Sequence, residues 1–167
     1  MVELSEISKE FTVRKIEEKD IEEALKLYQG NPMYFEYCPP EPSYETVYGD
    51  MIALPPRTNP KAKFFCGYYK NDELIAILDL IEKYPDRERC FIGFFMVKKE
   101  LQGEGLGTRI VTELFEYLKS LGYKYVRLGH AYGNPQADHF WKKNGFVDTG
   151  HIADALQYKI VMAEKEL

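Results

Sequence analysis

The chain has 167 residues, of which 45% are hydrophobic and 29% charged, with a formal net charge of −5. This length and composition predict one globular domain over residues 1–167. The acidic balance argues against nucleic acid and an anionic membrane surface as partners, and no apolar run is long enough to span a membrane. Cys38, Cys66 and Cys90 are widely spaced and form no CxxC pair. We therefore expect no disulfide framework and a reducing, cytoplasmic location.

The first half of the chain alternates strand and helix patterns with one proline-rich interruption. We predict strands over 11–16, 62–69 and 73–82, and helices from Asp20 to about Gly30 and from 44 to 54. The interruption, residues 31–43, combines aromatic residues with Pro39, Pro40 and Pro42 and is predicted to be irregular. It is expected to be either a lid facing a substrate, which we favour, or a loop packed on the core.

The second half is organised around one buried strand and the turn that follows it. Residues 89–97 end in a continuous apolar run, which is typical of a strand covered on both faces. The remaining predicted elements are a helix ending at Gly122, a strand over 125–129, a helix from Asn134 to Gly145, and strands over 146–149 and 157–163. Together the patterns predict a mixed α/β domain around one sheet of about seven strands, flanked by about four helices.

Glycines crowd the point where the strand over 89–97 gives way to a helix. Gln102, Gly103, Gly105 and Gly107 stand just before the helical repeat of apolar residues begins. The first turn of a helix has unpaired N–H groups and partial positive charge, so such a turn can bind phosphate. The alternative is a tight connection whose glycines serve packing alone. The spacing fits neither a nucleotide P-loop nor a dinucleotide fingerprint.

Two motifs at this separation resemble a known family. The first is Gln102-x-x-Gly105-x-Gly107 after an apolar strand, and the second is NPQADHFWKKNGF over residues 134–146. Both are similar to signatures of the GNAT (GCN5-related) N-acetyltransferases, and the upstream elements follow in matching order. The resemblance implies the fold of that family, in which the central mixed sheet is mostly antiparallel. It also implies transfer of an acetyl group from acetyl-CoA to an amine without a metal ion.

The resemblance also implies which residues hold the cosubstrate. The strand that pairs with the pantetheine arm corresponds to Phe95, Met96 and Val97, and is expected to diverge from the next strand near Val97 and Gly129. Asn134 corresponds to a contact of the cofactor arm, although capping its helix would explain it equally well. Trp141 is also expected to contact the cosubstrate. The residues expected to form the pyrophosphate turn are Gln102, Gly103, Gly105, Leu106, Gly107 and Thr108.

The sequence departs from the family pattern at two catalytic positions. Trp141 stands where the family often has a tyrosine acid, and an indole N–H is no usable acid. The family's base is often a glutamate on the central strand, yet residues 91–97 contain no carboxylate. The candidate bases are therefore Glu82, at the end of its strand, and His130, whose unperturbed pKa suits base work at neutral pH. The favoured alternative is that Glu82 is a solvated strand-end charge and His130 an ordinary loop histidine.

The acceptor is expected to be a primary amine of a small molecule or a peptide. A cationic acceptor would be attracted by Glu36, Glu41 and Asp50 if these residues face the cleft. A non-catalytic domain that binds or senses acyl-CoA is the alternative function, because both usual catalytic residues are replaced. A homodimer formed through the C-terminal strands is also expected to be possible. No group of His, Cys and carboxylate residues has metal-ligand spacing in the sequence.

Overall fold

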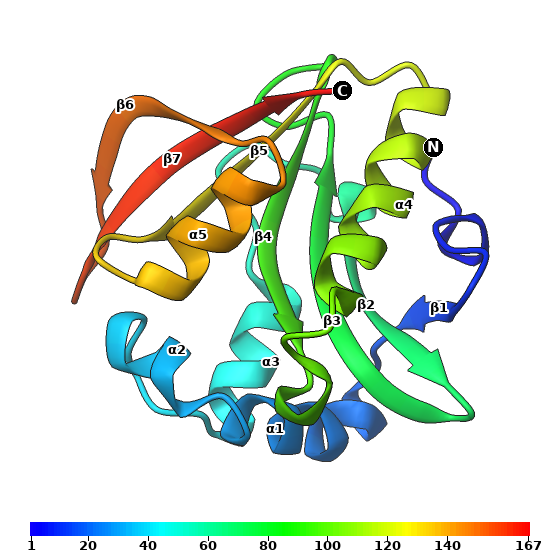
Figure 1. Ribbon diagram of the computed structural model, residues 1–167, viewed down its shortest axis with the longest axis vertical. Helices are drawn as coiled ribbons and strands as arrows, with labels where there is room; N and C mark the ends of the chain where they lie inside the picture. Colours follow the sequence, from blue (N-terminus) through cyan, green and yellow to red (C-terminus); the bar gives the residue numbers. More distant parts are fainter.

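The computed structural model describes all residues, 1–167, and contains one sheet between two helical layers. The sheet order is β1-β2-β3-β4-β5-β7-β6 (Figure 1). The strands are β1 (Thr12–Lys15), β2 (Lys63–Lys70), β3 (Glu73–Glu82), β4 (Arg89–Val97), β5 (Tyr125–Ala131), β6 (Val147–Asp154) and β7 (Lys159–Glu166). Only β4 and β5 pair in parallel, so the predicted mixed, mostly antiparallel sheet of seven strands is confirmed.

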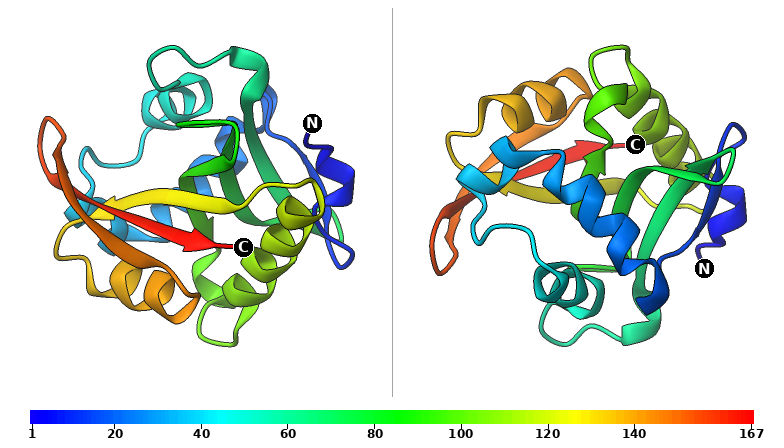
Figure 2. Two further views of the ribbon diagram at one scale, coloured as in Figure 1. Left: turned by 90° about the horizontal axis from the view of Figure 1, so that it is seen from above. Right: turned by 90° about the horizontal axis from the view of Figure 1, so that it is seen from below.

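Five helices cover the sheet, α1 and α3 on one face and α4 and α5 on the other (Figure 2). They are α1 (Ile21–Gln29), α2 (Pro32–Tyr37), α3 (Tyr44–Ile52), α4 (Leu106–Ser120) and α5 (Pro135–Lys143). Each face of the sheet buries its own hydrophobic cluster, as alternation of side chains along a strand requires. None of these helices is long and apolar enough to cross a membrane.

The segment 31–43 differs from its prediction, because its first half is the helix α2. Pro32 occupies the first turn of α2, where a missing N–H group is harmless and a fixed φ favours a helix. Phe35 is buried and stacks on Tyr28 of α1. The three prolines that suggested irregular structure all follow α2. The aromatic residues of this segment therefore form a short helix packed on the core.

One end of the β4–β5 pair is held closed by charged side chains. Glu164 of β7 accepts hydrogen bonds from Arg89 of β4 at 2.9 Å and from Arg127 of β5 at 2.8 Å. These two guanidinium groups hold the pKa of Glu164 below its usual range. The triad fastens three adjacent strands at the end where they pair. At the far edge of the sheet, β6 has one neighbour, and pairing of two copies through the C-terminal strands stays a prediction.

Candidate functional site

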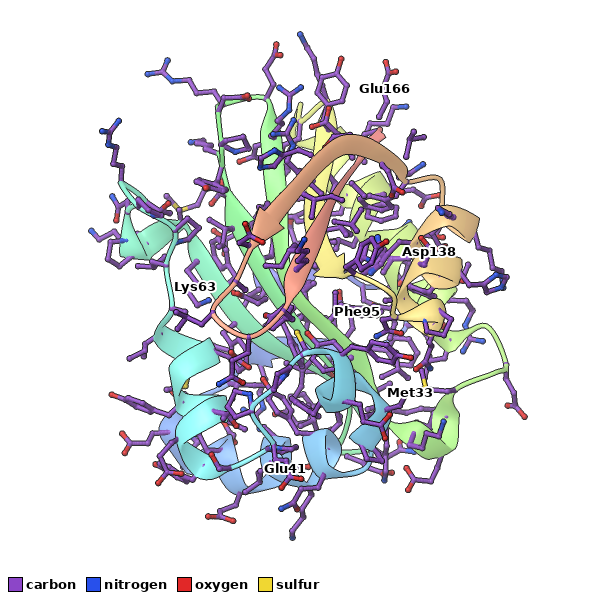
Figure 3. The ribbon with its side chains drawn as sticks, turned by 90° about the vertical axis from the view of Figure 1, so that its left-hand side faces the viewer. Met33, Glu41, Lys63, Phe95, Asp138 and Glu166 are labelled. Atoms are coloured by element: carbon purple, nitrogen blue, oxygen red, sulfur yellow. The ribbon has the colours of Figure 1, made fainter.

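Strands β4 and β5 pair only over their first halves and then diverge. Their last pair is Ile92 with Leu128, so the edge of β4 from Gly93 to Val97 has no partner strand. The divergence therefore begins at Gly129 on β5, as predicted, but earlier on β4 than Val97. A cavity of about 550 Å³ occupies the gap. Figure 3 looks onto this side of the molecule, where Phe95 lies between α2, which carries Met33, and α5, which carries Asp138.

The cavity brings together nearly every site residue predicted from the sequence. The lining residues among them are Phe95, Met96, Val97, Gln102, Gly103, Gly105, Leu106, Gly107, Thr108, His130, Asn134 and Trp141. Among the residues predicted to bind the cosubstrate or act in catalysis, only Glu82 does not line it.

Two glycines of the turn before α4 are required by backbone conformation. Gly103 has φ +88° and Gly105 has φ +81°, and a Cβ built at either would meet no atom within 4 Å. Packing alone therefore does not explain them, whereas a left-handed backbone does. Gly105 is the N-cap of α4, so the unpaired N–H groups of the first helical turn open onto the cavity. Gly107 is different, because a Cβ there would lie 3.1 Å from the ring of Phe140.

A buried amide network fixes this turn to the end of β4. The Gln102 side chain donates to the Val97 carbonyl oxygen at 2.7 Å and to Asn31 Oδ1 at 2.7 Å. Asn31 in turn donates to the same Val97 oxygen at 3.3 Å, and it is 8% exposed. Gln102 thus positions the turn through hydrogen bonds, a role that the sequence did not indicate. Asn31 was missed because nothing local distinguishes it from an ordinary residue after a helix.

The unpaired part of β4 presents backbone groups to the cavity. The N–H group of Lys98 bonds to Ile75 of β3 at 2.8 Å. Because N–H groups alternate in direction along a strand, those of Phe95 and Val97 point away from β3 toward the gap. Backbone donors on a free strand edge can pair with an extended amide-containing chain or stabilise a developing oxyanion.

Aromatic and thiol groups line the other end of the cavity. Tyr34 of α2, Cys38 after α2, and Tyr158 before β7 converge from two distant parts of the chain. Burial raises the pKa of all three groups, and the neighbouring Cys38 thiol adds to this effect on both tyrosines. None of the carboxylates Glu36, Glu41 and Asp50 lines the cavity. Asp50 is instead turned to the hydroxyl of Tyr28 at 2.9 Å.

Comparison with known proteins identifies the family and the fold. The family model described as "Acetyltransferase (GNAT) family" matches residues 22–146, well over half of the chain. The chain belongs to the GNAT acetyltransferase family. No curated protein matches the sequence. Many solved structures do match, and all those named below are less than 25% identical and so bear on the fold alone.

Three of these structures illustrate the likeness. An acetyltransferase from Thermus thermophilus has a TM-score of 0.73 at 19% identity, covering 94% of this chain and 97% of that one. The spermidine N-acetyltransferase of Vibrio cholerae, in complex with CoA and spermine, has a TM-score of 0.67 at 19% identity, covering 95% and 96%. The PaiA N-acetyltransferase of Thermoplasma acidophilum, in complex with coenzyme A, has 0.65 at 18%, covering 94% and 99%.

Helix α5 carries most of the second GNAT signature and, at Trp141, the residue that departs from the common pattern. Asn134 caps the helix, its Oδ1 accepting from the N–H groups of Gln136 at 3.1 Å and Ala137 at 3.2 Å. The capping role is thus shown, and contact with a cofactor arm stays a prediction. Trp141, in place of the common GNAT tyrosine, is 7% exposed and packs against the rings of Phe140 and Phe146.

The structure separates the two candidate bases. Glu82 pairs with Cys90 near the closed end of the sheet, where the Tyr123 hydroxyl donates to it at 2.6 Å. It lies outside the cavity because its partner Cys90 belongs to the part of β4 that is still paired with β5. His130 lines the cavity, but it shares the face of β5 with Leu128, which packs in the cluster under α4 and α5.

One acidic cluster was not foreseen from spacing. Ligand atoms of His130, Asp138 and Asp148 lie within 4.8 Å of one another. The ammonium group of Lys142 is 2.9 Å from Asp138 and 3.9 Å from Asp148, and it balances their charge. The three side chains come from β5, α5 and β6, and the packing of these elements brings them together. The Lys142 ammonium group therefore gives both carboxylates a cationic partner within the protein.

Proposed function

We propose that this GNAT protein transfers the acetyl group of acetyl-CoA to a primary amine of a small molecule or peptide by direct attack. One observation carries the proposal. A single cavity joins the glycine turn at the start of α4 to the unpaired edge of β4. The N–H groups at Gly105 and the helix start suit a pyrophosphate. The free edge at Phe95 and Val97 suits a pantetheine arm, and an N–H group at Val97 would polarise the thioester carbonyl.

The lining favours an amine carried on an apolar or aromatic group. Tyr34, Phe94, Tyr158, Ile160 and Met162 line the cavity, whereas no carboxylate does. A strongly polycationic acceptor would need opposite charge in its site. Because Glu36, Glu41 and Asp50 do not line the cavity, we do not expect them to attract a cationic acceptor. A sensor that binds acyl-CoA without turnover is the second candidate, and the presence of Trp141 is what favours it.

A matched pair of glycine variants tests the cofactor site. Gly105→Ala and Gly122→Ala both place a Cβ at positive φ with no atom within 4 Å, at opposite ends of α4. Each should destabilise the fold by about 1–2 kcal/mol. Calorimetric titration with acetyl-CoA should show micromolar binding by wild type and by Gly122→Ala. Gly105→Ala should bind at least about tenfold more weakly, which corresponds to about 1.4 kcal/mol.

Turnover on an amine panel then separates the two functions. The panel should contain aryl-alkyl amines, peptides with apolar N-termini, polyamines and aminoglycosides. Acetylation of any member supports the transferase, whereas acetyl-CoA binding without acetylation supports the sensor. If folded wild type does not bind acetyl-CoA, both functions are wrong. Equal weakening in the two glycine variants would show that backbone strain, not a phosphate site, causes the effect.

A further inference from the structure

A buried carboxylate near the cavity is only half satisfied. Asp79, in the middle of β3, is 7% exposed, and its Oδ2 accepts a hydrogen bond from the Lys63 ammonium at 2.7 Å. Its Oδ1 is buried and has no hydrogen-bond partner. A buried carboxylate oxygen without a donor is unfavourable, and buried polar groups in folded proteins are normally paired. The fold alone therefore gives no reason for Oδ1 to be there.

A bulge in β4 brings this carboxylate against Gly93, which itself lines the cavity. Asp79 is opposite Phe94 and Leu80 is opposite Ile92, so Gly93 is the extra residue between them. A Cβ built on Gly93 would lie 3.6 Å from Asp79 Cβ, 3.1 Å from Cγ and 2.4 Å from Oδ2. The Asp79 side chain therefore reaches across β4 and fills the space that any side chain at position 93 would need.

Gly93 is also where the cavity begins. It is the first residue of β4 beyond the last pair with β5, it is exposed, and it lines the cavity. On the same face of the sheet lies Phe94, whose ring is 5.4 Å from that of Tyr34 at the aromatic end. The carboxylate thus stands beside the aromatic end of the cavity, on the opposite face from His130. In Figure 3, Lys63, the partner of Asp79, and Asp138 of α5 lie on opposite sides of Phe95.

Charged and titratable groups face Asp79 from three other elements. Lys63 lies on β2, Asp50 lies on α3 and Tyr28 lies on α1, whereas Cys66 of β2 points to the opposite face of the sheet. Burial raises the pKa of Asp79 to about 6, the negative charge of Asp50 acts in the same direction, and Lys63 opposes both. A carboxylate in this range is largely ionised at neutral pH and can also hold a proton, as a general base must.

We propose that Asp79 accepts the proton of the acceptor ammonium group and so supplies the carboxylate that β4 itself lacks. The proton passes through one water molecule, because Asp79 lies behind Gly93 and is not in the cavity wall. The N–H bond of the ammonium breaks and an O–H bond forms on Asp79. The neutral amine then forms a C–N bond to the acetyl carbon, the C–S bond breaks, and the thiolate takes the second amine proton. This inference rests on the proposed transferase function.

Three variants test this role on the best amine of the panel, with kcat measured from about pH 5 to about pH 9 at saturating acetyl-CoA. Wild type should lose activity on the acid side with a midpoint near the Asp79 pKa of about 6. Asp79→Asn should lower kcat about 100-fold at neutral pH and abolish that midpoint, since general-base catalysis contributes at least this much. Acetyl-CoA affinity in calorimetry should stay within about twofold.

Lys63→Met and Glu82→Gln complete the set. Removing the Lys63 cation leaves the carboxylate harder to ionise, so the acid midpoint should move to higher pH. A merely structural lysine would not move it. Glu82→Gln removes the other buried carboxylate of β3, which lies outside the cavity, and should leave both kcat and the midpoint as in wild type.

Several results would overturn the assignment. One is an Asp79→Asn protein that keeps kcat within about threefold and the same acid midpoint. Another is an unchanged midpoint in folded Lys63→Met, which decides the matter if Asp79→Asn does not fold. Loss of the midpoint in Glu82→Gln would give the role to Glu82. Failure of the transferase function itself is recognised separately, because wild type would then show no acetyl-CoA binding or no acetylation before any variant is compared.

Discussion

The two ends of the cavity differ in whether backbone groups or side chains form most of the lining. The end at the glycine turn is made mainly of backbone: the strand edge at Phe95 and Val97, and the helix start at Gly105. The other end is made of side chains from separate elements, with Tyr34 from α2 and Tyr158 next to β7. Backbone groups fit a ligand that never changes within a family, whereas side chains can vary with the acceptor. The proposed cosubstrate and acceptor sites divide the cavity in this way.

The largest expected effect that tests this division is at Asn134. Asn134→Ala removes both the helix cap and the free amide, and should cost about 1 kcal/mol of the free energy of unfolding. Asn134→Asp keeps the accepting oxygen, so stability should be unchanged or slightly higher because of the helix dipole. Both variants should weaken acetyl-CoA binding about tenfold in calorimetry, since each lacks the amide donor. Amine KM should not change in either.

This pair of variants separates the two roles of Asn134. Denaturant unfolding measures the cap, and calorimetry measures the cofactor contact. If both variants bind acetyl-CoA as wild type does, Asn134 only caps α5, and the cofactor end uses backbone groups alone.

A smaller effect is expected at the aromatic end, from Tyr158→Phe. The variant keeps the ring and removes the hydroxyl that lies beside the Cys38 thiol. Loss of one hydrogen-bonding group should raise the amine KM about fivefold, or about 1 kcal/mol, and leave acetyl-CoA affinity unchanged. Tyr132→Phe is the control, because Tyr132 is 61% exposed and outside the cavity. Weaker acetyl-CoA binding with an unchanged amine KM would contradict the division of the cavity.

The same division explains what could be predicted from the sequence. Positive-φ glycines and a capping asparagine are local requirements, so their spacing records the turn at Gly105 and the start of α5 directly. Strand existence was likewise predictable, since β3 and β4 are mainly apolar and β5 begins with a short, largely apolar segment. The seven strands and their mixed pairing follow from those runs together with the family resemblance.

No local sequence pattern marks the aromatic end of the cavity. Tyr158 is distant in sequence from Tyr34 and Cys38, and it meets them only because α2 lies near the start of β7. The helix α2 itself was hidden by the prolines that follow it. Two signals for the proposed base were present, however: Asp79 interrupts an apolar strand, and Gly93 interrupts another, which is typical of a buried functional charge and of a bulge. Only the strand register shows that they meet.

The smallest expected effect on the reaction concerns Trp141, which also lines the cavity. Trp141→Tyr restores the residue common in the family, and Trp141→Phe is its matched control without a hydroxyl. Because Trp141 is surrounded by Phe95, Phe140 and Phe146, the new hydroxyl would enter an aromatic cluster. Both variants should lose about 1–2 kcal/mol of stability through lost packing.

Their kcat values should agree within about threefold, because the thiolate takes its proton from elsewhere. If Trp141→Tyr is instead about tenfold faster than Trp141→Phe, a hydroxyl at this position does reach the leaving group. The tryptophan would then limit the rate of the chemical step, and the slow transfer that it causes would bring the protein closer to an acyl-CoA sensor than to an efficient transferase.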